Sequence, residues 1–600
     1  MTLPHEGSIA QLLAGIDLFS NVGPAALDLL AGHAESVHLP GGETLMREGD
    51  PSDALYVLAS GRLQAFVGTE SEETLVGEIG RGEVIGEMGI LADERRSATV
   101  RALRDSNLVR IPSDAFIGFL HDSPEEMFKL TSLLIARLRR SIRAEAPGSS
   151  VRTIAIVPVG EGDDAGAFAR FLTSVQAEGR EARLVVGADV DHVRDDEELT
   201  RLLHDLERDQ ELLLYLADRE PSAWTDRCLR QADRVVVVGQ ADRESGLSRL
   251  EQQLFGRDGS TVRARVDLVL TQPPEAAEPR HGQRWLAQRP VHRLHHVRLT
   301  SRDDLQRVAR ALTGREIALV LSGGGARGIA HFGLFRALAE LGIPIDVVGG
   351  SSFGSIAAAG LAMGWPWDEQ RRMFAEDFVS QGSPVDLTAP VVSLAKGAKV
   401  TAGIRRGFGD TLIENLWLRY YCVSSNLSAG EVAVHSRGPL WKALRASVAI
   451  PGLWPPVPSE EGDVLVDGGV MNNLPVDVMQ TFSDAGAIIA VNLKGSAELP
   501  SAGLTDSGVM SGWGPFARRL NPVGKGSGMP GIVDLLLRAT ETGNVLSSKR
   551  LEQQADIVLH PDVAEFGLLA FDRLDEIIEA GYRYAIKELP VHQELLDRLL

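Results

Sequence analysis

Residues 346–360 read DVVGGSSFGSIAAAG, and this pattern predicts a strand, a tight turn and a helix in that order. Val347 and Val348 end an apolar run, while the small residues from Ser355 onward favour a helix. The intervening GSSFG has the spacing G-x-S-x-G, in which glycines permit a strained turn that exposes the hydroxyl of Ser352 at the start of the helix. Because glycine and serine are common residues, an ordinary strand–helix turn explains this stretch equally well.

A second glycine turn lies upstream, where residues 322–328 read SGGGARG between an apolar run and a helical pattern. Gly323, Gly324 and Gly325 would direct several backbone N–H groups into one cavity, and such donors stabilise the oxyanion that forms at an attacked carbonyl. Arg327 adds positive charge, either to hold the loop or to meet a phosphate. Gly323, Gly325 and Gly328 also satisfy the spacing G-x-G-x-x-G, so a nucleotide phosphate loop stays an alternative, although the serine turn ends the next strand and disfavours it.

A carboxylate follows at the end of a third apolar run, in VLVDGGVMNNLPV at residues 464–476. Asp467 could take the serine proton as a general base and return it as a general acid, although an Asp-Gly turn is the ordinary explanation. His331, on the helix after the glycine turn, and His435, in a turn-like segment, have no motif around them. The sequence therefore favours a Ser–Asp dyad over a Ser–His–Asp triad, with an Asp467 whose partial burial raises its pKa.

The motifs GGGARG, GSSFG, ASVAIPGLWPPV and DGG occur in this order within residues 322–469 and together resemble the patatin-like phospholipase family. The resemblance implies an α/β hydrolase domain that cleaves fatty-acyl esters of lysophospholipids or phospholipids. It implies Ser352 as nucleophile and Asp467 as base, with an oxyanion hole made by Gly323, Gly324, Gly325 and Arg327. No metal-ligand cluster is visible in the sequence, so we expect neither a metal nor another cofactor for catalysis.

Residues 15–110 alternate short β-like runs with glycine turns, which predicts a small all-β roll. Within it, GEVIGEMGILADERRSATVRA at residues 82–102 resembles the phosphate-binding cassette of cyclic nucleotide-binding domains. The resemblance implies that Glu87 bonds the ribose hydroxyl and that Arg96 pairs with the cyclic phosphate. The resemblance also implies four further residues that line this cyclic nucleotide site: Gly86, Met88, Ser97 and Ala98.

The effector implied by this cassette is cAMP or cGMP, with cAMP favoured, and residues 125–143 would form the lid helix of the domain. A Glu87–Arg96 ion pair inside a purely structural β-roll is the alternative.

Residues 151–312 contain apolar runs separated by charged helical segments, which predicts a Rossmann-like α/β layer with a mostly parallel sheet. The segment resembles the region before the patatin domain in neuropathy target esterase and its relatives, and lacks the Lys-Ser/Thr ending of a P-loop. The whole chain differs from that family because it has one cyclic nucleotide-binding module rather than several. We also expect no N-terminal membrane anchor, which argues against stable membrane residence.

We therefore predict a multidomain chain of three parts. Residues 1–145 form a cyclic nucleotide-binding β-roll with its lid helix, residues 146–312 a degenerate Rossmann/P-loop-like linker domain, and residues 313–600 a patatin-like α/β hydrolase domain.

The amino-acid composition narrows the possible partners and the cellular location of the protein. Lys and Arg number 61 against 82 Asp and Glu, a net charge of −21, which disfavours nucleic acid as a partner. Only Cys228 and Cys422 are present, so no disulfide framework exists and a reducing compartment fits best. No signal peptide or membrane span is recognised, so we expect a cytoplasmic protein, with peripheral contact at the inner membrane surface and homo-oligomerisation left open.

Two functions from different classes fit these observations. The first is a serine esterase that acts on lipids and is modulated by its cyclic nucleotide-binding module. The second is a catalytically silent scaffold that senses a cyclic nucleotide. For the esterase, three tryptophans are candidates to line an acyl pocket or to touch a bilayer, with core packing as the ordinary alternative: Trp365, Trp367 and Trp454.

Overall fold

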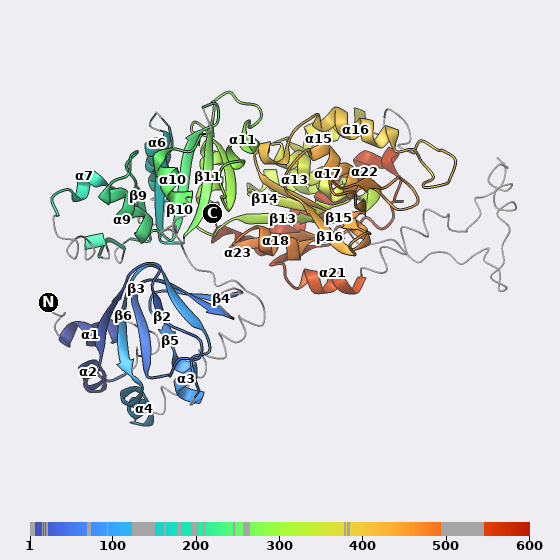
Figure 1. Cartoon of the computed structure of the whole chain (residues 1–600). Helices are drawn as coiled ribbons and strands as arrows, with labels where there is room; N and C mark the ends of the chain where they lie inside the picture. Colours follow the sequence, from blue (N-terminus) through green and yellow to red (C-terminus); the bar gives the residue numbers. More distant parts are fainter. Residues whose placement is uncertain are drawn as a thin grey trace. The chain divides into compact units, whose positions relative to one another are not determined.

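The computed structural model of the chain (Figure 1) forms two compact units, Met1–Pro274 with Arg284–Gly314 and Glu275–Gln283 with Arg315–Leu600. The predicted lid helix at residues 125–143 lies outside the described residues. The two units do not correspond one to one with the three predicted domains, so the three-domain division stays a prediction. The structure describes residues 6–14, 16, 19, 22–68, 74–92, 94–122, 151–160, 162, 164–176, 182–193, 199, 202–203, 205–207, 210–243, 246–255, 264–376, 380, 385–493 and 545–599.

The first unit begins with an antiparallel β-roll, as the sequence predicted. Its strands pair in the order β1-β6-β3-β4, with β2 on β6 and β5 on β3. Apolar side chains from the long strands β3 and β6 fill the interior of the roll. Ile90 of the short helix α3 packs into this interior. The elements are α1 (Glu6–Ala14), α2 (Pro24–Gly32), β1 (Glu35–Leu39), β2 (Thr44–Met46), β3 (Ala54–Val67), β4 (Thr74–Ile79), β5 (Val84–Ile85), α3 (Glu87–Ala92), β6 (Thr99–Pro112) and α4 (Ser113–Asp122).

The same unit continues into a six-stranded parallel sheet of order β12-β11-β10-β7-β9-β8, which confirms the predicted Rossmann-like layer. Its central strands are buried on both faces, which explains their continuous apolar runs. The elements are β7 (Thr153–Pro158), α6 (Asp164–Gln176), β8 (Ala182–Val186), α7 (Gly187–Val190), β9 (Leu212–Leu216), α9 (Ala223–Gln231), β10 (Arg234–Gln240), α10 (Arg249–Phe255), β11 (Arg265–Gln272), β12 (Arg293–Arg298) and α12 (Arg302–Leu312). The short helix α11 (Gly282–Leu286) spans the boundary at which the chain returns to this unit.

The second unit is an α/β fold around one mixed sheet of order β17-β18-β15-β14-β13-β19-β20, with β16 on β15. Strands β15, β14, β13, β19 and β20 run parallel, whereas β16 and β18 pair antiparallel with β15. The strands are β13 (Ile317–Leu321), β14 (Val347–Ser351), β15 (Arg419–Asn426), β16 (Glu431–His435), β17 (Val457–Pro458), β18 (Val464–Asp467), β19 (Ala487–Val491) and β20 (Ile557–Leu559).

Helices cover this sheet, and two of them approach one another at backbone distance. A Cβ on Gly333 would lie 2.0 Å from the carbonyl oxygen of Ile578, so α13 and α22 touch through a glycine. This packing joins the helix after the glycine turn to a helix near the C-terminus. The α-helices are α13 (Ala330–Glu340), α14 (Phe353–Ala362), α15 (Trp367–Phe374), α16 (Ala398–Phe408), α17 (Leu440–Ser447), α18 (Val476–Phe482), α21 (Val545–Glu552), α22 (Leu574–Glu588) and α23 (Gln593–Asp597).

Short 3-10 turns complete this unit, and two of them adjoin the glycine motifs. They are η1 (Gly325–Ile329), η3 (Ile413–Asn415), η4 (Gly468–Val470), η5 (Phe571–Arg573) and η6 (Leu589–His592). Among the helices that the structure describes, none has the combined length and apolar character needed to cross a bilayer.

Candidate active site

Ser352 is the single residue between strand β14 and helix α14. Its φ of 51° lies in the left-handed region, which costs a non-glycine residue strain of about 1–3 kcal/mol and is found mainly at functional sites. The helix begins at Phe353, two residues before the predicted start, because the turn is only one residue long. A Cβ on Gly354 would lie 2.4 Å from the carbonyl oxygen of Leu321, so only glycine lets α14 approach β13 this closely.

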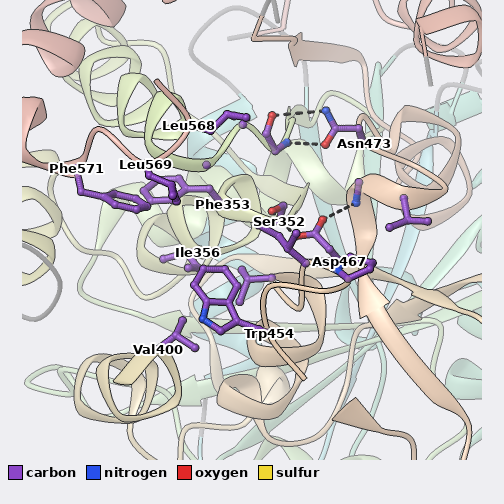
Figure 2. Close-up of a pocket in the computed structure, with 18 of the residues that line it drawn as sticks. Ser352, Phe353, Ile356, Val400, Trp454, Asp467, Asn473, Leu568, Leu569 and Phe571 are labelled. Atoms are coloured by element: carbon purple, nitrogen blue, oxygen red, sulfur yellow. Dashed lines mark hydrogen bonds between the residues drawn. The ribbon is translucent and has the colours of Figure 1, made fainter. Parts of the chain in front are cut away.

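The strand register brings Asp467 level with Ser352. Ser351 pairs with Val423 across β14 and β15, and Ser424, the next residue of β15, pairs with Asp467 of β18. The sharp turn then swings the hydroxyl of Ser352 across, and its Oγ donates a hydrogen bond of 2.7 Å to Asp467 Oδ2 (Figure 2). Two residues that are 115 positions apart in the sequence thus form one buried pair.

Burial changes the chemistry of the Asp467 carboxyl. The group is 5% exposed, and this desolvation raises its pKa to about 6, against the opposing effect of two hydrogen bonds that favour the carboxylate. These bonds come from the Ser352 hydroxyl and from the backbone N–H of Gly469, which donates to Oδ1 at 2.8 Å. A carboxylate with a pKa near neutrality is a stronger base than an exposed Asp and is still ionised at pH 7.

The glycine turn lines the same pocket, and Asn473 holds it there. The backbone N–H of Gly323 donates to Asn473 Oδ1 at 3.1 Å, while Asn473 Nδ2 lies 3.5 Å from the Gly323 carbonyl oxygen (Figure 2). The N–H of Gly323 is therefore already hydrogen-bonded to Asn473. Within the described residues, the structure gives no acceptor for the N–H groups of Gly324 and Gly325, and both residues line the pocket with Ser352.

Arg327 does not line the pocket in the described part of the chain. Its guanidinium is buried, and Nε donates to the Phe566 carbonyl oxygen at 2.9 Å. Of the two roles left open by the sequence, this geometry supports holding the loop.

Neither candidate histidine meets the dyad through a hydrogen bond that the structure gives. His331 on α13 has Nε2 3.0 Å from the Ser322 carbonyl oxygen, and burial lowers its pKa to about 4, so the neutral ring donates to that carbonyl. His435 was predicted in a turn but lies on strand β16, where its Nε2 is 2.7 Å from Ser424 Oγ. The pairing of β16 with β15 extends the strand to His435, whereas the Ser-Arg-Gly-Pro that follows this residue had indicated a turn.

The pocket above the dyad is apolar and encloses about 950 Å³, its open side included. Trp454 lines it, as the sequence allowed, whereas Trp365 lines a second, adjoining pocket and Trp367 packs against Arg336. Figure 2 shows how side chains from separate segments converge on Ser352. Besides the motif residues, the apolar lining consists of Phe353, Ile356, Phe374, Val400, Val448, Ile450, Pro451, Val470, Leu568, Leu569 and Phe571.

The cassette residues of the β-roll also come together. Gly86 has a φ of 87°, and Arg96 Nη1 lies 3.3 Å from its carbonyl oxygen. Arg96 further donates through Nη2 to Asp53 Oδ1 at 3.1 Å and to the Ala54 carbonyl at 2.7 Å. The sequence did not single out Asp53, and the ion pair given for Arg96 is with this residue rather than with Glu87.

One polar atom at this cassette fits an anionic ligand. Arg96 Nε is buried and has no hydrogen-bond partner within the described residues. Glu87 is buried at the start of α3, whereas Met88 and Ser97 are exposed and Ala98 is half-buried. The residues present therefore fit a cyclic phosphate held at Arg96.

Comparison with known families matches three consecutive parts of the chain. Residues 36–123 match the cyclic nucleotide-binding domain, residues 150–318 the P-loop-like domain of the neuropathy target esterase family, and residues 319–479 patatin-like phospholipase.

Curated relatives align with most of the chain. Patatin-like phospholipase domain-containing protein 7 of Rattus norvegicus is 31% identical over 626 residues, covering 93% of this chain and 46% of the relative. Patatin-like phospholipase domain-containing protein 6 of Homo sapiens is 32% identical over 605 residues, covering 90% and 43%. Lysophospholipase nte1 of Aspergillus oryzae is 30% identical over 636 residues, covering 92% and 41%. The chain thus spans less than half the length of these relatives.

Proposed function

Since this chain contains a cyclic nucleotide-binding domain, a P-loop-like domain of the neuropathy target esterase family and a patatin-like phospholipase domain, we propose that it is a serine esterase. Its substrates are fatty-acyl esters of lysophospholipids or phospholipids. The observation that carries the proposal is the buried 2.7 Å hydrogen bond from Ser352 to Asp467 beneath an apolar pocket.

Hydrolysis proceeds in two steps. Ser352 Oγ attacks the ester carbonyl while Asp467 takes its proton, and the N–H groups of Gly324 and Gly325 stabilise the oxyanion. The intermediate then collapses to an acyl-enzyme, and Asp467 returns the proton to the departing lysolipid or glycerophosphoryl alcohol. In the second step Asp467 deprotonates a water molecule that attacks the acyl-enzyme, which releases the fatty acid and restores Ser352.

The silent-scaffold alternative explains the site less well. A left-handed serine and a buried carboxylate each destabilise the fold, and a scaffold gains nothing from combining them. The apolar lining supports a fatty-acyl chain in the pocket, with the ester placed at the one polar corner formed by Ser352, Asp467 and the glycine turn.

The regulatory and cellular parts of the proposal rest on other observations. Buried Arg96, with its unpartnered Nε, supports a cyclic nucleotide effector, for which cAMP is our choice over cGMP. The cysteine content supports a cytoplasmic location, and an enzyme of this class must meet its lipid at a membrane or micelle surface. Homo-oligomerisation stays open.

Hydrolysis of a lysophospholipid tests the proposal, with fatty-acid release measured for the wild type, Ser352→Ala and Asp467→Asn, each with and without cAMP or cGMP. Asp410→Asn is the matched control, because Asp410 is 87% exposed. We expect Ser352→Ala and Asp467→Asn to lose at least about a hundredfold in rate while Asp410→Asn retains it. Equal rates for all four proteins would overturn the esterase assignment.

A further inference from the structure

A short hairpin in the second unit presents apolar side chains to water. Residues 386–395 fold back on themselves, with a bridge between Leu387 and Ala395. Leu387 is 75% exposed, Val391 90% and Val392 68%. Among the described large hydrophobic residues, Val391 and Leu387 are the two most exposed, so this tip is an apolar patch that folding alone does not explain.

The base of the hairpin is firmly held. Both carboxylate oxygens of Asp386 accept backbone N–H groups at the start of α16, from Gly397 and Ala398, each at 2.9 Å. The N–H of Thr388 donates to the Leu394 carbonyl oxygen at 3.0 Å. The exposed tip is therefore carried on an ordered support.

That support is hydrogen-bonded to the segment that carries Trp454 into the pocket. The N–H of Leu394 donates to the Gly452 carbonyl at 2.8 Å, and the N–H of Ala395 donates to the Leu453 carbonyl at 2.9 Å. The neighbouring Trp454 lines the pocket, as does Val400 in the first turns of α16, and Figure 2 shows both on the same side of it. The base of the hairpin is therefore joined directly to residues next to the pocket.

Basic residues outnumber acidic ones around the hairpin base, although the whole chain carries −21. The acidic residues there are Asp386, whose carboxylate caps α16, and Asp410, which pairs with Arg405 at 3.4 Å. Lys396 is exposed just before α16 and Lys399 is exposed in the first turn of that helix, while Arg405 and Arg406 lie in its last turn. Apolar side chains beside cations match the interface of a membrane with anionic lipids, which attracts each nearby Lys or Arg and accepts the apolar tip.

We propose that hairpin 386–395 docks this unit on an anionic lipid surface. Leu387, Val391 and Val392 enter the headgroup region, while Lys396 and Lys399 meet lipid phosphates. The consequence for catalysis, delivery of the bilayer lipid to the pocket beside Trp454, rests on the proposed function. The docking itself does not, and it can be measured without turnover.

Vesicle flotation tests the docking on the full chain carrying Ser352→Ala, so that no lipid is consumed. The vesicles contain phosphatidylcholine with or without phosphatidylglycerol. The perturbing variant is Val391→Asp with Val392→Asp, and Val591→Asp is the matched control because Val591 is also exposed, at 72%. We expect the double variant to lose about tenfold or more in partitioning while the control binds as the parent. Unchanged melting temperatures exclude misfolding.

Charge is tested with Lys396→Glu and Lys399→Glu, which should weaken binding to phosphatidylglycerol vesicles and reduce its salt dependence. Equal flotation of the parent and the Val391/Val392 variant would overturn the proposal, as would an equal loss in Val591→Asp. Loss of self-association instead of lipid binding in the Val391/Val392 variant would assign the tip to a contact between two copies and overturn it too. Normal flotation with an inactive wild type would overturn only the proposed function.

Discussion

Replacing Asn473 by Asp places a second carboxylate beside the base. A Cβ built on Gly469 would lie 3.0 Å from Asn473 Oδ1 and 3.1 Å from Asp467 Oδ1, so these two oxygens are no more than about 6 Å apart. The new carboxylate would accept the N–H of Gly323, and burial already raises the pKa of Asp467 to about 6, above that of an ordinary Asp. Asp467 is therefore the group that must hold the proton.

The size of the effect follows from this separation. At an effective dielectric constant of about 20, two charges at about 6 Å repel by about 3 kcal/mol, which is about two pH units. The pKa of Asp467, about 6 in the wild type, should then rise toward about 8 in Asn473→Asp. Since the base must be ionised, kcat/KM at pH 7 should fall about tenfold and recover by about pH 9.

The assay is the pH dependence of kcat/KM for a soluble ester, which reports the free enzyme. Asn473→Ala is the control, since it removes the hydrogen bond to Gly323 without adding charge. This variant should lose about three- to tenfold at every pH, with the rising limb unmoved near pH 6. A rising limb that stays near pH 6 in Asn473→Asp would refute the assignment of Asp467 as the base.

Three other variants have defined outcomes. Asp467 keeps its proton up to about pH 6 in the folded protein but loses it near pH 3.8 in the unfolded chain, so folding stability should fall as the pH rises between these values. Asp467→Asn should therefore melt at a higher temperature than the wild type at pH 7.5, with an unfolding free energy larger by up to roughly 3 kcal/mol. This difference should vanish near pH 4. The second pocket shares Ile356 and Phe374 with the first, and a Cβ on Gly407, which lines it, would meet only Met373 Cε, at 3.7 Å. Gly407→Leu should fill this pocket and lower kcat/KM for palmitoyl esters about tenfold relative to butyryl esters, whereas Gly407→Ala should not. Identical chain-length profiles for the two variants would contradict this. Arg96→Ala should weaken cAMP binding about ten- to a hundredfold in calorimetry, and exposed Arg95→Ala should leave it unchanged.

Local sequence patterns singled out Ser352 and Asp467 because each lies at the end of an apolar run beside glycines, and the proximity of the two side chains follows from strand register. Gly468 illustrates why the glycines are there: a Cβ on it would lie 2.4 Å from the Val423 carbonyl oxygen. The helix start at Phe353 was misplaced by two residues, because sequence does not show that the turn contains one residue.

The residues that sequence did not single out depend on long-range packing. Asn473 lies a few residues after Asp467, but nothing local indicates that it, rather than Asn472, bonds Gly323, which is 150 positions away. Leu568 and Leu569 reach the pocket through the packing of the C-terminal segment against the glycine turn, where the N–H of Ala326 donates to the Leu568 carbonyl at 2.9 Å. Such contacts have no periodicity in the sequence to reveal them.

The most direct test of the Ser352–Asp467 pair is covalent labelling by a fluorophosphonate, read by intact mass and peptide mapping at pH 7.5. The wild type should gain one adduct, on Ser352, at a rate that falls at least about a hundredfold in Asp467→Asn and to zero in Ser352→Ala. An adduct on another serine, or labelling of Ser352→Ala at the wild-type rate, would contradict the account.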